Sequence, residues 1–259
     1  MSICFYKYQG AGNDFILIDN RNLTFEADNI SLIARMCDRR FGIGADGLML
    51  LQDCAPYDFE MRYFNSDGRE ASMCGNGGRC IVSFANHLKI IDTAARFMAV
   101  DGVHEATLEK DGNINLKMSD VSNIEIHGNE FYLNTGSPHF VRFVEDLDGF
   151  DVFGEGRKVR YNDRFREKGT NVNFVRLENN QLTVYTYERG VEDETLACGT
   201  GITASALCAA LKTGVGKGSF PVTAKGGNLR VSFEKTENGF ANIWLKGPAV
   251  FVFRGEFIV

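Results

Sequence analysis

The sequence predicts an α+β fold built from two β-rich halves, each with a central helix. Three observations lead to this prediction. Short β-like runs dominate, helical periodicity is confined to three places, and the motif Glu-x-x-x-Cys-Gly-x-Gly occurs twice, at residues 70–77 and 194–201. Each half of the 259-residue chain carries one copy. This repetition indicates a duplicated architecture that brings two thiols into one central cleft.

The predicted strands are short apolar runs, several of them alternating, separated by turns rich in Gly, Asn or Asp. They cover residues 15–19, 47–51, 59–65, 140–144, 172–176, 182–187, 229–233, 241–245 and 250–253. Many short strands with such turns favour antiparallel sheets over repeating β-α-β units.

Helical periodicity predicts three helices. The first covers residues 30–37, where apolar residues recur at i, i+3, i+4 and i+7 after a capping Asp28 or Asn29. The second covers about residues 75–88, and the third about 199–212, with Gly214 as its C-terminal stop.

These elements predict two domains that pack closely. The first covers residues 1–120, with a returning C-terminal strand at about 249–259, and the second covers residues 121–248. No linker rich in Pro or Ser separates them.

Composition argues against several kinds of partner. The chain is 44% hydrophobic, with a net charge of −6, a pI near 5.3 and no Lys/Arg cluster, so no nucleic acid and no membrane surface is expected to bind. No apolar stretch approaches the roughly 18 residues of a membrane-spanning helix, and the N-terminus lacks the apolar core of a signal peptide. We expect a cytoplasmic protein acting on a small molecule. The sequence leaves the oligomeric state open, with a homodimer as one candidate.

The cysteines and histidines do not form a metal-binding pattern. The seven cysteines lack Cys-x-x-Cys spacing, and the four histidines are scattered singly, so no zinc or other metal is expected. An odd number of cysteines in a chain of this length also argues against a secreted disulfide framework. Five of them are expected to pack as small apolar residues: Cys4, Cys37, Cys54, Cys80 and Cys208.

In each motif the cysteine stands immediately before a Gly-x-Gly turn that opens a predicted helix. The first amides of a helix lack intrahelical acceptors and lie at the positive end of its dipole, so they bind a carboxylate without an arginine. The same field lowers the pKa of an adjacent thiol. Each motif therefore combines an anion site with an activated thiol, at Cys74 and at Cys198.

Two such thiols suit the inversion of a stereocentre. Inversion requires removal of a proton from one face of a carbon and delivery of another to the opposite face. A thiolate and a thiol perform this in either direction by exchanging roles. Carboxylate binding at two helix N-termini would help to stabilise the carbanion-like transition state.

The chain resembles the diaminopimelate epimerase family. The motifs that carry the resemblance follow one another in the family's order: KYQGAGNDF (7–15), FGIGADGL (41–48), NSDGREASMCGNGGRC (65–80), TGSPHF (135–140), GTNVNF (169–174) and YERGVEDETLACGTG (187–201). One difference is Ser137, where many relatives have Asn before Pro-His. The segment 145–165 matches none of the family's motifs.

The resemblance implies two pseudo-symmetric, barrel-like antiparallel domains with the active site in the cleft between them. It implies a cofactor-independent isomerase that interconverts LL- and meso-diaminopimelate, in lysine and peptidoglycan precursor synthesis. Cys74 and Cys198 would be the acid/base thiols, and His139 and Glu188 would influence their protonation. The substrate-binding residues implied are Asn13, Asn65, Gly75, Asn76, Asn171, Glu188, Arg189, Gly199 and Thr200.

Most of these residues also have an ordinary structural reading. Asn13, Asn65 and Asn171 suit turns and strand ends, and Glu188 with Arg189 could form an exposed charge pair of little energetic value. A histidine such as His139 is more often a buried structural residue than a catalytic one. The family context is what favours the functional reading of each.

Three other functions compete with this hypothesis. Proline racemases and phenazine-type isomerases resemble the fold, but a proline pocket would not need polar anchors such as Asn65, Asn171 and Arg189. A pyridoxal-phosphate racemase would use a lysine such as Lys7, Lys89 or Lys168. A thiol-based redox or ligand-binding protein would not need two anion-binding turns of the same design.

Overall fold

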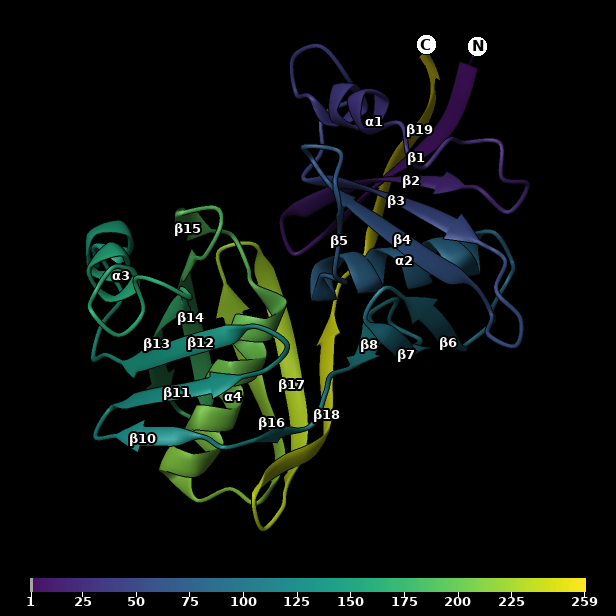
Figure 1. The fold of residues 1–259 in the computed structure, drawn as a ribbon. Helices are drawn as coiled ribbons and strands as arrows, with labels where there is room; N and C mark the ends of the chain where they lie inside the picture. Colours follow the sequence, from purple (N-terminus) through teal and green to yellow (C-terminus); the bar gives the residue numbers. More distant parts are fainter. Residues whose placement is uncertain (1) are drawn as a thin grey trace. The chain divides into compact units, whose positions relative to one another are not determined.

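The computed structural model describes residues 2–259 and divides into two compact units (Figure 1). Unit 1 contains the residues up to Leu116 together with Gly247–Val259, and unit 2 contains Lys117–Lys246. The described residues hold four α-helices and many strands, so each unit is β-rich.

Unit 1 is a curved sheet with two helices. Its strands are hydrogen-bonded in the order β19-β1-β2-β3-β4-β6-β7-β8, and β5 pairs with β4. The elements are β1 (Ser2–Gly10), β2 (Asn13–Asp19), α1 (Ile30–Cys37), β3 (Gly47–Gln52), β4 (Glu60–Asn65), β5 (Glu70–Ala71), α2 (Gly75–His87), β6 (Ala94–Ala99), β7 (Gly102–Leu108), β8 (Ile114–Lys117) and β19 (Val250–Ile258).

Unit 2 repeats this plan. Its order is β10-β11-β12-β13-β14-β16-β17-β18-β9, and β15 pairs with β14. The elements are β9 (Val121–Ser122), β10 (Glu125–His127), β11 (Glu130–Asn134), β12 (Pro138–Phe143), α3 (Val152–Arg160), β13 (Asn171–Glu178), β14 (Gln181–Glu188), β15 (Asp193–Thr195), α4 (Gly199–Thr213), β16 (Lys217–Ala224), β17 (Gly227–Lys235) and β18 (Gly239–Gly247).

The two orders match element by element, from β19 and β10 through β1 and β11 to β8 and β18. In each unit the sheet is mixed, which differs from the purely antiparallel pairing expected from the sequence. β2 pairs parallel with β3, and β4 with β6; the equivalent pairs β12–β13 and β14–β16 are also parallel. Each parallel pair is joined through a helix because a parallel connection must cross from one end of the sheet to the other.

The second helix of each unit lies on the concave face of its sheet. α2 contacts β1, β2, β3, β7 and β19, and α4 contacts β11, β12, β13, β14, β16 and β17. These strands extend from β19 at one end of the hydrogen-bonded order in unit 1 to β7, next to the other end, and they make up most of the order in unit 2. Each sheet therefore curves around its helix. Both helices are largely buried, in keeping with a central position.

The first helix of each unit packs on the opposite face. Ile16 and Ile18 of β2 join Ile33 and Met36 of α1 in one buried cluster. In unit 2, Val152 and Val159 of α3 pack with Phe174. The three predicted helices are confirmed, and α1 is capped by Asn29, whose side chain accepts a hydrogen bond from the Leu32 amide. The sequence analysis missed α3, which lies in the segment without a family motif.

Candidate active site

The first cysteine motif ends at the N-terminus of α2. Cys74 is the N-cap residue, with extended backbone angles, and Gly75 and Asn76 form the buried first turn. No acidic residue lies in that turn, so no side chain of the turn itself would repel an anion at the positive end of the helix dipole. Cys74 is half-buried and forms no disulfide.

A polar network lies behind this turn. The Arg79 guanidinium donates to Asn76 Oδ1 at 2.9 Å, to the Gly75 carbonyl at 3.3 Å and to the Pro248 carbonyl at 3.2 Å. Asn76 Nδ2 donates to Asn13 Oδ1 at 2.6 Å, and Asn13 Nδ2 donates to Asp46 at 2.8 Å. The structure thus brings together Asn13 and Asn76, two residues expected from the sequence to bind substrate, and joins both to a buried arginine.

The second motif ends in the same way at α4. Cys198 is the N-cap residue, also with extended backbone angles, and Gly199 and Thr200 open the helix. Cys198 is buried and forms no disulfide, and its Sγ lies 3.4 Å from the Thr200 hydroxyl. His139 Nε2 lies 2.9 Å from the same hydroxyl. The structure therefore connects His139 to Cys198 through Thr200.

Asn173 fixes the tautomer of His139, that is, which of the two ring nitrogens carries the proton. Its side-chain Nδ2 donates to the Phe140 carbonyl and to His139 Nδ1, both at 3.0 Å, while its Oδ1 accepts from Thr186. His139 Nδ1 is therefore an acceptor, Nε2 carries the proton, and Nε2–H donates to Thr200. Burial, with a smaller contribution from the charge of Arg189, lowers the pKa of His139 to about 3, so the ring is neutral at physiological pH.

A second polar cluster in unit 2 is formed by Ser137, Asn171 and Arg189. Asn171 Nδ2 donates to Ser137 Oγ at 2.9 Å, and Asn171 Oδ1 accepts from the Arg189 backbone amide at 2.9 Å. The Arg189 guanidinium reaches Ser137 Oγ at 3.5 Å. Glu188 ends β14, and the strand register of β13 and β14 places it beside Asn171. Asn171, Glu188 and Arg189, three of the residues expected from the sequence to bind substrate, thus lie together.

The remaining motif residues lie apart from these groups. Asn65 is exposed at the end of β4, opposite Gly47 in the register. Glu70 binds Arg62 through two hydrogen bonds of 2.8 and 2.9 Å, and the equivalent Glu194 binds Lys225 at 2.6 Å. Each motif glutamate therefore pairs with a basic residue of its own unit.

The glycines that follow the two cysteines show how closely other elements approach the turns. A Cβ at Gly77 would lie 3.1 Å from Met49 Cε and 3.6 Å from Phe15, whereas a Cβ at Gly201 would lie 2.3 Å from Asn173 Oδ1 and 3.2 Å from His139. Phe15 and Met49 thus occupy in unit 1 the places of His139 and Asn173 in unit 2. The side chains packed beneath the first turn are therefore apolar, and those packed beneath the second turn are polar.

Four residues of these networks were absent from the sequence prediction: Arg79, Asp46, Asn173 and Thr186. Three of them lie within quoted motifs, Asp46 in 41–48, Arg79 in 65–80 and Asn173 in 169–174. Alignment of the two cysteine motifs would have singled out Arg79, because it stands opposite Thr203. Thr186 lies outside the quoted motifs, and only the strand pairing of β13 with β14 brings it near Asn173.

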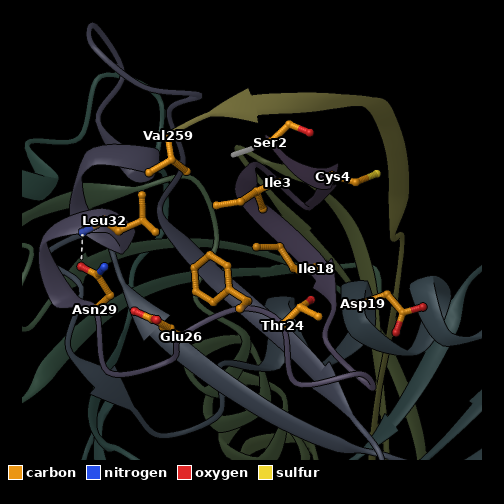
Figure 2. A pocket seen from close by; sticks show the side chains of 11 residues that line it. Ser2, Ile3, Cys4, Ile18, Asp19, Thr24, Glu26, Asn29, Leu32 and Val259 are labelled. Carbon is orange, nitrogen blue, oxygen red and sulfur yellow. Dashed lines mark hydrogen bonds between the residues drawn. The ribbon is translucent and has the colours of Figure 1, made fainter.

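A separate pocket of unit 1 does not belong to this site. It lies between β1, β2 and the start of α1, where Figure 2 shows Ile3, Ile18 and Leu32 with Glu26 near its edge. None of the predicted site residues lines it. Within residues 2–259, every helix is too short or too polar to cross a bilayer, and no cluster of three His, Cys, Asp or Glu residues is arranged for a metal ion.

Comparison with known proteins agrees with the sequence resemblance. The family model described as diaminopimelate epimerase matches residues 5–124 and 131–252. The diaminopimelate epimerase of Flavobacterium psychrophilum is 51% identical over 249 residues, covering 96% of this chain and 97% of the relative. That of Chlorobaculum tepidum is 43% identical over 259 residues, covering 95% and 98%.

Solved structures show the same fold at much lower identity. A phenazine biosynthesis protein of the PhzF family from Bacillus anthracis aligns with a TM-score of 0.75 at 16% identity, covering 100% of both chains. A hydroxyproline epimerase from Agrobacterium vitis, with bound trans-4-hydroxy-L-proline, aligns with a TM-score of 0.69 at 13% identity, covering 98% of this chain and 92% of that chain. These likenesses establish the two-domain β-rich fold alone.

Proposed function

The chain belongs to the diaminopimelate epimerase family, and from this premise we propose that it interconverts LL- and meso-2,6-diaminopimelate. The reaction is a proton transfer at one α-carbon, in which one thiol group acts as base and the other as acid. The pathway in which it acts is lysine biosynthesis, and the meso product also serves as a peptidoglycan precursor. We further propose that the enzyme works in the cytoplasm.

The observation that carries this proposal is the presence of two equivalent thiol turns. Cys74 and Cys198 each cap a long helix whose first turn contains no acidic residue. The amides of Gly75 and Asn76, with those of Gly199 and Thr200, would hold the carboxylate at the reacting carbon. Since that carboxylate must accept charge as the proton leaves, binding at two helix N-termini favours the transition state.

The unreactive end of the substrate also carries an amino group and a carboxylate, so it needs polar partners. Asn171 and Arg189, joined through Ser137, supply amide and guanidinium groups of that kind. We assign them to this end together with Asn65 and Asn13. Both ends of the Asn13 side chain are hydrogen-bonded, to Asn76 and Asp46, so Asn13 would act partly by holding Asn76 in place.

His139 and Glu188 would adjust the second thiol. His139 is neutral and donates through Nε2 to Thr200, so the hydroxyl hydrogen of Thr200 points to Cys198 Sγ. This series of hydrogen bonds, from His139 through Thr200 to Cys198, would orient the thiol of Cys198 as the proton moves on and off sulfur. Because the two thiols supply both proton transfers, the proposed reaction uses no cofactor.

The test is incubation of reduced protein with LL-diaminopimelate in heavy water, without added cofactor. We expect an LL/meso mixture, with deuterium at the α-carbon of the newly formed isomer. L-Proline and trans-4-hydroxy-L-proline serve as matched substrates and are expected to show no exchange. Exchange of a proline with none of diaminopimelate would replace the proposal with a proline-type racemase, and no exchange of any of the three would reject both.

A further inference from the structure

Two parts of unit 2 have no role in the site described above: the helix α3 and the turn of residues 190–193. α3 contacts β13, β14 and β15 (Figure 1). Its Gly156 packs so closely on β14 that a Cβ there would lie 2.4 Å from Tyr187 Cβ. α3 ends at Arg160, and the turn carries Glu192. The two parts meet at the carboxylate of Glu192.

This carboxylate accepts hydrogen bonds from four groups. Oε1 of Glu192 accepts from Arg160 Nε at 3.2 Å and from the Gly190 amide at 3.1 Å. Oε2 accepts from the hydroxyl of Tyr161 at 3.0 Å and from that of Tyr187 at 3.2 Å. The bond from Arg160 is also an ion pair, and only 13% of the arginine side chain is exposed. One carboxylate therefore ties the end of α3 to β14 and to its own turn.

The carboxyl group of Glu192 is ionised at neutral pH. Burial opposes its ionisation, but hydrogen bonds from the Gly190 amide and Tyr161, with the charge of Arg160, hold the pKa of Glu192 below its usual range. Hydrogen bonds to a charged acceptor are stronger than those between neutral groups. The four bonds therefore hold the turn firmly.

The backbone of the turn needs such support. Glu192 has a φ of +59°, in the left-handed region that residues other than glycine rarely adopt. Its amide donates to the Glu188 carbonyl at 2.8 Å, which closes the turn around Arg189. An uncommon backbone conformation persists where the surrounding contacts over-determine it. The contacts of the Glu192 side chain do so here.

The side chains of Arg189 and Arg160 are neighbours over Gly169. A Cβ at Gly169 would lie 2.6 Å from Arg189 Cδ and 3.0 Å from Arg160 Cζ. Two like charges so near one another repel. Because the Glu192 carboxylate pairs with Arg160, it offsets this repulsion and keeps the two arginines in separate places.

We propose that Glu192, held by α3, is a positioning residue that fixes Arg189 where its guanidinium meets the carboxylate at the unreactive end of the substrate. This inference rests on the proposed function, in which Arg189 binds that end. It gives α3 a role in substrate binding, although no residue of the helix touches the substrate. Since the unreactive end takes no part in proton transfer, loss of Glu192 weakens substrate binding more than it slows the chemical step.

The first test measures turnover of LL-diaminopimelate by two variants. Glu192→Gln removes the charge, and Glu192→Gly removes all four side-chain hydrogen bonds but accepts the left-handed backbone. We expect KM to rise about threefold or more in the first variant and about tenfold or more in the second, with kcat within about threefold of wild type. A wild-type KM in folded Glu192→Gly would overturn the inference. If circular dichroism shows that this variant does not fold, the KM of Glu192→Gln decides.

The matched control is Glu155→Gln. Glu155 lies on the same helix and pairs with Lys158, whose side chain is largely exposed. The control removes one negative charge from α3 without touching the turn of residues 190–193. Both kcat and KM should stay at their wild-type values. A rise in KM equal to that of Glu192→Gln would mean that the charge of α3 as a whole, and not the Glu192 contacts, causes the effect.

A double variant shows whether Glu192 acts through Arg189. In an Arg189→Ala background, Glu192→Gly should lower kcat/KM by less than about twofold, since the group that it positions is already absent. A purely structural role would repeat the full single-variant effect in that background. Full additivity of the two losses would therefore contradict the positioning role.

A measurement without substrate separates this inference from the proposed function. Hydrogen exchange followed by mass spectrometry reports the opening of residues 188–194, and Glu192→Gln should speed exchange there by about threefold or more, whereas Glu155→Gln should not. Faster exchange in an enzyme whose wild type turns over no substrate would reject the epimerase proposal and keep the role of Glu192 in holding the turn. Unaltered exchange and KM in an active enzyme would reject that role and keep the epimerase.

Discussion

The first turns of α2 and α4 have the same backbone design and different surroundings. In both, a cysteine caps the helix and two glycines follow it closely. Beneath the first turn lie Phe15 and Met49, with buried Arg79 behind; beneath the second lie His139 and Asn173, with Thr203 in place of the arginine. Repetition of the backbone therefore gives two thiols of similar geometry, and substitution of the supporting side chains gives them different surroundings.

The largest effect is expected from removing either thiol. Cys74→Ala and Cys198→Ala should each lower kcat for epimerisation by about 10²–10⁴-fold or more, because each removes one acid/base group. The measurement is initial turnover of LL- and of meso-diaminopimelate, with circular dichroism as the control for folding. Substantial turnover by either folded variant would remove the two-base assignment and, with it, the functional equivalence of the two turns.

The next largest effect is expected from alanine substitutions at the glycines of the two turns, which should differ in their cost in stability. Gly201→Ala places a methyl 2.3 Å from Asn173 Oδ1 and should displace the Asn173–His139 support, with a loss of about 1–3 kcal/mol in the free energy of unfolding. Gly77→Ala meets the flexible end of Met49 at 3.1 Å, so the gain in helix propensity, up to about 1 kcal/mol, offsets much of its cost. Urea unfolding of both variants gives the comparison. Equal losses of unfolding free energy in the two variants would mean that the polar side chains beneath the second turn are no more rigid than the apolar side chains beneath the first.

His139 should make the stability of unit 2 depend on pH. Its pKa is about 3 in the folded protein and about 6.5 when unfolded, so below pH 6.5 the unfolded state binds more protons. Stability from this group is fully present above the unfolded pKa and is lost as pH falls toward 3, by at most about 1.4 kcal/mol per pH unit. Unfolding free energies at pH 5 and 7 test this. His139→Phe, which copies the Phe15 of unit 1, should have a flatter pH dependence, and an unchanged slope would contradict the assignment.

The smallest effects are expected at the motif glutamates. Glu70→Gln removes a partly exposed pair with Arg62, so the free energy of unfolding should fall by about 1 kcal/mol or less. Glu194→Gln is the matched change for the pair with Lys225 and should behave alike. Turnover should stay within about threefold for both. A loss of tenfold or more in one variant would indicate that its glutamate touches substrate and that the two motifs differ there as well.

Much of the fold could be predicted from the sequence because its signals are local. The spacing over residues 30–37, the helices after both cysteines and the short strand patterns all reappear in the structure. α3 could not be predicted, because Gly154 and Gly156 interrupt its helical pattern. The structure explains the second glycine: a Cβ at Gly156 would lie 2.4 Å from Tyr187 Cβ, so the helix can pack on its strand only without a side chain there.

The site could be predicted to the extent that motifs name residues. The two N-cap cysteines and the Asn13–Asn76 and Ser137–Asn171–Arg189 groups come from quoted motifs. The supporting residues required the strand register, which is a long-range property. The parallel pairing of β12 with β13 sets Asn173 near His139, and the β13–β14 register adds Thr186. Antiparallel pairing throughout, as first expected, would not have produced these neighbours.

The return of β19 to unit 1 has a consequence for how the protein is made. β1 pairs along its length with β19, from Ser2 opposite Ile258 to Gln9 opposite Val250, while unit 2 is one continuous segment between them. During synthesis on the ribosome, unit 2 is therefore complete before unit 1 receives its final strand. Until then, one edge of β1 is left open to other strands, and this interval is where a nascent chain would be most exposed to mispairing and would gain most from a chaperone.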